Sequence, residues 1–205
     1  MNKLEFQLPF NGEWLTFWGG DTPKQNHHHE NASQKYAYDF VQTDKKETFF
    51  RIDGKTNDDH FSFGQNVFAP ADGEVTEVVD GLHDNIPGDT HNYAILGNFL
   101  MIRHNKSTFS VLSHFKQQSI VVKAGQKIRQ GDKLGLCGNS GNSAAAHIHF
   151  HVQDSDIFAR YNDKYERINV AKGKKISFKK IKVSNNGKQK LLENYSPIKG
   201  DTLSN

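Results

Sequence analysis

The segment His147-Ile148-His149-Phe150-His151 says more about the fold than any other stretch of this 205-residue chain. In a β-strand successive side chains point to opposite faces, so the three imidazoles are predicted on one face and the two apolar side chains on the other. A buried imidazole needs a hydrogen-bond partner for its ring N–H, which core packing seldom supplies. Closely spaced histidines with a distant third ligand are typical of zinc sites. The segment therefore favours a metal-binding strand over a strand with one solvent-facing side.

Two other segments carry residues that could complete a metal site. His27-His28-His29 lies far upstream, and Asp39 follows it between two aromatic residues. A carboxylate that points inward from a buried strand is costly unless it is paired or bound to a metal. The apolar run of residues 109–115 is another predicted strand, and it ends at His114, which alone would be an ordinary strand-end histidine.

The rest of the chain is predicted to be rich in β-structure. Strand candidates cover residues 75–79, 99–104, 108–114, 133–137 and 147–152. The composition includes 15 Phe and 17 Gly, which suits short strands joined by glycine turns, and helical periodicity is weak. Residues 53–66 and 81–97 are predicted long loops, where substrate grooves are often shaped. We therefore predict a single, mainly antiparallel β domain with its site in an open groove.

Composition also excludes several classes of protein. The single cysteine, Cys137, rules out an intramolecular disulfide. No apolar run approaches the length of a membrane span. Residues 1–8 alternate like a strand and lack the apolar centre of a signal peptide, so a cytoplasmic location is expected unless the chain is trimmed or exported by another route.

The C-terminal part of the chain is basic. Residues 161–205 contain 11 Lys and Arg against 4 Asp and Glu. Such a segment can bind polyanions such as wall polymers or nucleic acid. The apolar pattern from Ile176 to Val183, followed by a turn at Asn186-Gly187, instead favours a hairpin whose lysines face solvent. No nucleic-acid partner is therefore expected.

Residues 68–154 resemble the lysostaphin/LytM-type family of zinc metalloendopeptidases. The shared motifs are Ala-Pro-Ala-Asp-Gly-Glu-Val at 69–75, Ser-His-Phe at 113–115, the Val-Val-Lys-Ala-Gly segment that begins at 121, Gly-Leu-Cys-Gly-Asn-Ser-Gly-Asn-Ser at 135–143, and Ala-His-Ile-His-Phe at 146–150. The resemblance implies an antiparallel β-sheet or sandwich with an open groove, related to duplicated-hybrid-motif barrels. It also implies one metallopeptidase domain over residues 1–205, with a catalytic core at about 20–155 and a basic hairpin extension at about 160–205.

The resemblance assigns roles to individual residues. His149, the second histidine of His-x-His, corresponds to a zinc ligand, and Asp39 to a second. His147 and His114 correspond to the two histidines that flank the catalytic water. Which of these two accepts the proton of the water and which stabilises the oxyanion stays open.

The first zinc ligand is the point at which this chain departs from the family pattern. The family usually has a histidine four positions before the aspartate, where this chain has Lys35. The best match is a divergent branch with a long insertion between histidine and aspartate. In that alignment His28 is the ligand, with His27 and His29 as alternatives.

The implied function is zinc-dependent hydrolysis of peptide bonds in peptidoglycan cross-links or stem peptides, and this substrate implies action at the cell wall or outside the cell. One alternative is a catalytically degenerate module that binds the cell wall or activates another hydrolase. A second is a lipoyl- or biotinyl-carrier-like module, because residues 122–131 resemble the turn repeat of those domains. The chain lacks their modifiable Met-Lys-Met lysine, and a carrier has no use for a His-x-His strand.

Overall fold

The predicted β fold is confirmed by the structure, a computed structural model that describes residues 4–161, 164, 167–185 and 188–205. Its strands are β1 Trp14–Trp18, β2 Tyr38–Val41, β3 Asn66–Phe68, β4 Gly73–Val79, β5 Asn98–Asn105, β6 Thr108–Phe115, β7 Lys127–Ile128, β8 Lys133–Leu136, β9 Ile148–Gln153, β10 Ala159–Tyr161, β11 Arg167–Asn169, β12 Phe178–Asn185, β13 Lys188–Tyr195 and β14 Thr202–Ser204. The helical structure in these described ranges is one short 3₁₀ turn, η1 Asn57–Asp59. All five predicted strands are present as β4, β5, β6, β8 and β9.

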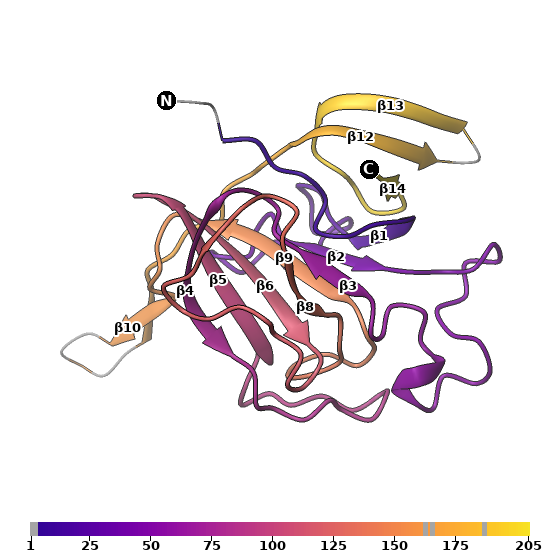
Figure 1. Cartoon of the computed structure of the whole chain (residues 1–205), viewed down its shortest axis with the longest axis horizontal. Helices are drawn as coiled ribbons and strands as arrows, with labels where there is room; N and C mark the ends of the chain where they lie inside the picture. Colours follow the sequence, from indigo (N-terminus) through magenta and orange to yellow (C-terminus); the bar gives the residue numbers. More distant parts are fainter. Residues whose placement is uncertain (1–3, 162–163, 165–166, 186–187) are drawn as a thin grey trace.

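Ten of the strands form one sheet, in the order β13-β12-β14-β1-β2-β9-β6-β5-β4-β7 (Figure 1). Its paired strands are antiparallel. The small sheets β10–β11 and β3–β8 are separate from it. Strand β9 therefore lies near the middle of the main sheet, between β2 and β6, where it is paired on both sides.

The C-terminal strands extend the same sheet. β12 and β13 pair as a hairpin, and β14 lies between β12 and β1. In Figure 1 this part, in yellow, lies beside β1 at the top of the view. The predicted turn at Asn186-Gly187 lies outside the described residues. The division into a catalytic core and a C-terminal extension stays a prediction.

The main hydrophobic core covers one face of the central strands. Phe40 of β2 pairs with Ile148 of β9, and Leu112 of β6 pairs with Phe150 of β9. These four side chains are buried in one cluster together with residues of the N-terminal segment and of β3 and β8. The opposite face carries Asp39 on β2 and polar side chains on β9, whereas on β6 it carries Phe109 and Val111 of a second hydrophobic cluster.

In the part of the chain that the structure describes, no helix has both the length and the apolar character that a membrane span requires.

Candidate metal centre

Strand β9 presents two chemically different faces, as the sequence predicts. Ile148, Phe150 and Val152 belong to the hydrophobic core. His149 and His151 alternate with them and are both buried. His147 directly precedes the strand. The two-residue period of the strand thus gathers the histidines on one face.

Asp39 meets His149 across the neighbouring strand. The two residues are paired in the register of β2 and β9, and the Asp39 Oδ1 atom lies 2.9 Å from His149 Nδ1. Asp39 is only 4% exposed. Cross-strand pairing therefore accounts for a contact between residues that are 110 positions apart in the chain.

The upstream histidines lie on a loop that the amide of Asn26 holds in place. Asn26 is fully buried, and its Nδ2 donates to the carbonyl oxygens of Gly20, Lys35 and Ala37. Its Oδ1 accepts the backbone N–H of His28 at 3.0 Å. One buried side chain thus fixes the loop that carries the histidines against the segment leading into β2.

Two of the three loop histidines reach Asp39. The Asp39 Oδ2 atom lies 3.0 Å from His28 Nε2 and 3.3 Å from His27 Nε2. His29 instead contacts Glu30. The His28 side chain is 16% exposed and its ring centroid is 4.7 Å from that of His149, whereas the His27 side chain is 52% exposed and stacks on Trp18. This geometry favours His28 as the first ligand.

His114 reaches the site because its strand is irregular. Strict alternation would point His114 to the same face as Leu112, into the core. The pairing of β5 with β6 instead passes from Phe99↔Ser113 to Asn98↔Phe115, so His114 is the extra residue of a bulge, with φ of +64°. Its ring lies 4.7 Å from the His147 ring and 5.8 Å from the His149 ring, measured between centroids.

The glycine-rich turn before β9 supports this bulge. The His114 carbonyl accepts the N–H of Gly138, and a Cβ at Gly138 would lie 2.2 Å from the backbone nitrogen of Lys116. A Cβ at Gly141 would lie 2.3 Å from the backbone nitrogen of Gly97. The turn can pack this closely against the end of β6 and against Gly97, just before β5, only because these positions lack side chains.

His114 and His147 have matching hydrogen bonds on Nδ1. His114 Nδ1 lies 2.7 Å from the carbonyl oxygen of Ser140, and His147 Nδ1 lies 2.9 Å from that of Ala145. A carbonyl oxygen only accepts hydrogen bonds, so each Nδ1 carries the proton and each Nε2 keeps its lone pair. His147 Nε2 lies 3.7 Å from Asp39 Oδ1. With one proton on Nδ1, each ring can accept a second proton at Nε2.

Burial sets the charge states within the cluster. It lowers the pKa of His149 to about 4 and that of His114 well below the usual value, because a charged ring is poorly solvated there. Burial alone would raise the pKa of Asp39, but the neighbouring His28 and His147 outweigh it and hold that pKa well below its usual range. A buried carboxylate surrounded by imidazoles is a donor set that suits a metal ion.

The cluster opens into a cleft of about 790 Å³. Its walls include Phe17 and Trp18 of β1, Phe49 and Phe50 of the segment after β2, and Ile95 of the loop between β4 and β5. Residues 142–146 lie along it next to His147. The predicted long loop at 81–97 thus borders the cleft, and much of the cleft surface is aromatic or aliphatic.

About half of the chain matches the model of a known protein family. The family model described as peptidase family M23 matches residues 58–160. The chain belongs to peptidase family M23. This confirms the predicted resemblance to lysostaphin/LytM-type enzymes. The matched segment contains His114, His147 and His149, whereas His28 and Asp39 precede it.

Curated relatives of this M23 family member match it over short segments. An uncharacterized metalloprotease of Haemophilus influenzae is 33% identical over 93 residues, which cover 44% of this chain and 17% of the relative. Peptidoglycan DD-endopeptidase ShyA of Vibrio cholerae is 32% identical over 69 residues, or 34% of this chain and 16% of that enzyme. The chain spans less than a fifth of the length of these relatives.

Solved structures of similar proteins include a zinc-containing peptidase from Vibrio cholerae. It is 20% identical, with a TM-score of 0.47, and the match covers 82% of this chain and 39% of the other.

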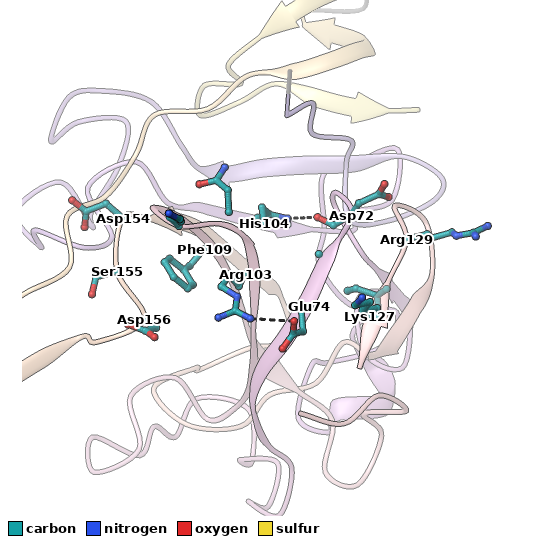
Figure 2. Close-up of a pocket in the computed structure, with 14 residues that line it drawn as sticks. Asp72, Glu74, Arg103, His104, Phe109, Lys127, Arg129, Asp154, Ser155 and Asp156 are labelled. Atoms are coloured by element: carbon teal, nitrogen blue, oxygen red, sulfur yellow. Dashed lines mark hydrogen bonds and ion pairs between the residues drawn. The ribbon is translucent and has the colours of Figure 1, made fainter. Parts of the chain in front are cut away.

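A second hollow, of about 810 Å³, lies at the other end of β6 from His114, next to Phe109 (Figure 2). Its lining balances basic against acidic side chains: Arg103, Lys106, Lys127 and Arg129 against Asp72, Glu74, Asp154 and Asp156. In Figure 2 Arg103 turns toward Glu74 and His104 toward Asp72. His104 also contacts Ser110 Oγ through its other ring nitrogen. Both ring nitrogens of its one described histidine are engaged, and its charges balance. Among the described residues, this hollow therefore has no counterpart of the histidine–aspartate cluster.

Among the loop histidines, we expect His28→Ala to lower zinc affinity far more than His27→Ala, because His28 is the more buried and lies against His149. His29→Ala should leave zinc affinity unchanged, because His29 faces Glu30. Competition with a chromophoric chelator measures all three variants on one scale. If zinc affinity instead falls in His27→Ala and stays unchanged in His28→Ala, His27 is the ligand.

Proposed function

We propose that this M23 family member is a zinc-dependent endopeptidase that hydrolyses peptide bonds in peptidoglycan cross-links or stem peptides. The observation that carries the proposal is the position of two proton-accepting histidines, His114 and His147, beside a buried group of imidazole and carboxylate donors. Family membership and the peptidoglycan DD-endopeptidases among the relatives support the same reading.

The donor set fits zinc. His28 Nε2, Asp39 and His149 Nδ1 would hold the ion, because one Asp39 oxygen lies 3.0 Å from His28 Nε2 and the other lies 2.9 Å from His149 Nδ1. Both distances are close to the separation of roughly 3.3 Å that zinc–ligand bonds of ~2.0–2.1 Å give in a tetrahedral site. Three protein ligands leave a fourth position for water or substrate, as catalytic zinc sites do.

The chain's own residues would carry out the proton transfers. Bound zinc supplies Lewis acidity, which polarises a scissile carbonyl and lowers the pKa of water. His114 and His147, each protonated on Nδ1, present Nε2 as the atom that receives a proton from water. Once protonated, the same nitrogen can donate to the developing oxyanion or to the leaving amine. The division of these steps between the two histidines stays open.

The cleft would hold the peptide next to these groups. Asp39 is the only acidic side chain and histidines are the only basic ones among the described residues that line it. Substrate binding would therefore depend on backbone hydrogen bonds and apolar contacts with walls such as Phe17 and Phe50.

Release of new amino groups from purified peptidoglycan tests this proposal. We expect release by the zinc-loaded chain and none after chelation, with recovery when zinc is restored. Walls with direct and with glycine-bridged cross-links should be compared, because the bond is part of the proposal. If no wall type releases amines while the protein still sediments with the walls, the binding-module alternative replaces the peptidase.

A further inference from the structure

A line of hydrogen bonds runs along β9 away from the candidate metal centre. His149 Nε2 lies 2.9 Å from His151 Nδ1, and His151 Nε2 lies 3.1 Å from Gln153 Oε1. Gln153 Nε2 then donates to the carbonyl oxygen of Ser155 at 2.7 Å. The three side chains occupy alternate positions of one strand, so the line follows from the strand period.

The last contact fixes the direction of the others. Because the Ser155 carbonyl only accepts, the Gln153 amide must turn its NH₂ to Ser155 and its oxygen to His151. His151 therefore carries its proton on Nε2 and presents a lone pair on Nδ1. That lone pair accepts only if His149 carries a proton on Nε2. A neutral His149 is then left with its lone pair on Nδ1, the atom that faces Asp39.

The surroundings of the three side chains favour this order. His149, His151 and Gln153 are each at most 2% exposed. On β6, Val111 is paired with His151 and Phe109 with Gln153, and both belong to a second hydrophobic cluster with Phe99 and Met101. An unmatched buried donor or acceptor costs about 1–3 kcal/mol, so a reversed tautomer is penalised.

A competing arrangement of the protons explains why this line of hydrogen bonds matters. Without the constraint, His149 would gain by placing its proton on Nδ1 and donating it to the Asp39 carboxylate. That tautomer blocks the nitrogen that a metal needs. It would also require His151 to donate from Nδ1, which leaves its Nε2 lone pair against the oxygen of Gln153.

We propose that His151 and Gln153 are positioning residues that hold His149 in the Nε2–H tautomer and so keep its Nδ1 available to the metal. The inference rests on the metal site of the proposed function, and it assigns a role to two residues that do not contact the ion. Partners of this kind typically change metal affinity about 10–100-fold when they are lost.

The test uses the full chain and two readouts that need no peptidoglycan. Nitrogen-15 NMR of the imidazoles at pH 8 should find His151 protonated on Nε2 in the metal-free wild type, and in Gln153→Met its Nδ1–H form should increase. Chelator competition should show zinc binding about 10–100-fold weaker in Gln153→Met. Gln153→Glu, which keeps an acceptor oxygen toward His151, should restore the Nε2–H form and most of the affinity.

A matched control separates positioning from stability. His104 is half-buried and is also bonded through both ring nitrogens, but it lies at the second hollow. His104→Phe should lower the melting temperature while zinc affinity stays at the wild-type value. If Gln153→Met unfolds, His151→Phe serves as the second test, with the same expected loss of affinity.

The outcomes separate this inference from the proposed function. Wild-type zinc affinity in Gln153→Met, or His151 protonated on Nδ1 in the wild type, overturns the positioning role even if walls are hydrolysed. The predicted tautomer and affinities in a chain that releases nothing from walls uphold the positioning role and overturn the peptidase.

Discussion

We expect Asp39→Ala to abolish tight zinc binding, and we expect no other single substitution to lower zinc affinity more. Asp39 contacts His28 through one carboxylate oxygen and His149 through the other. Its loss therefore removes one ligand and also the contacts that link the other two ligands. It also leaves the site without its only negative charge among the described residues of the cleft. Zinc content after desalting, measured by atomic emission, gives the answer, and His149→Ala should give the same result.

Asp154 supplies the control for Asp39. It follows β9 directly and lines the second hollow, where its side chain accepts a backbone N–H from Lys172. Asp154→Ala should therefore retain about one zinc per chain. Full zinc occupancy in Asp39→Ala or in His149→Ala would refute the ligand assignment.

Replacing His147 or His114 should separate catalysis from metal binding. His147→Ala should retain zinc while turnover falls by about 10²–10⁴-fold, the usual loss when a general acid or base is removed. For His114 the better substitution is asparagine, because φ at this position is +64° and asparagine tolerates that conformation better than alanine. Amine release and zinc content should be measured on the same preparations.

Two results would contradict this second prediction. Loss of zinc from His147→Ala would make His147 a ligand, and unchanged turnover in both variants would remove them from the reaction. The double variant is informative as well, because residues that act in one step give losses that do not add.

The face of β9 that carries His149 was predictable because a strand has a strict period of two. Ile148 and Phe150 mark the buried side in the sequence itself, and the structure places them in the core as expected. The pairing of Asp39 with His149 could not be predicted from the strand period alone, because register depends on which strands are neighbours. The family resemblance supplied that link.

The position of His114 could not be read from the same periodicity. Alternation along residues 109–115 assigns it to the core face, and the bulge that redirects it is visible only in the pairing of β6 with β5. The loop histidines present a similar difficulty, because a loop has no period. Their placement depends on Asn26, whose three carbonyl partners are not adjacent in the sequence.

His151 and Gln153 show a third kind of limit. The strand pattern places His151 on the face of His149, but it gives no role to Gln153, which continues the same face. The role of both residues depends on the carbonyl oxygen of Ser155, which accepts a hydrogen bond from Gln153. The position of that oxygen follows from the path of the chain after β9.

The pairing of Asp39 with His149 places the two donors on adjacent strands in the middle of a ten-stranded sheet. An ion held there would join β2 to β9 in the native chain and would have no equivalent site in the unfolded one. Resistance to heat and to denaturant would then rise with the logarithm of free zinc, by about 2.7 kcal/mol at a hundredfold excess over the dissociation constant. Chelators would accordingly shorten the lifetime of the folded protein as well as stop its chemistry.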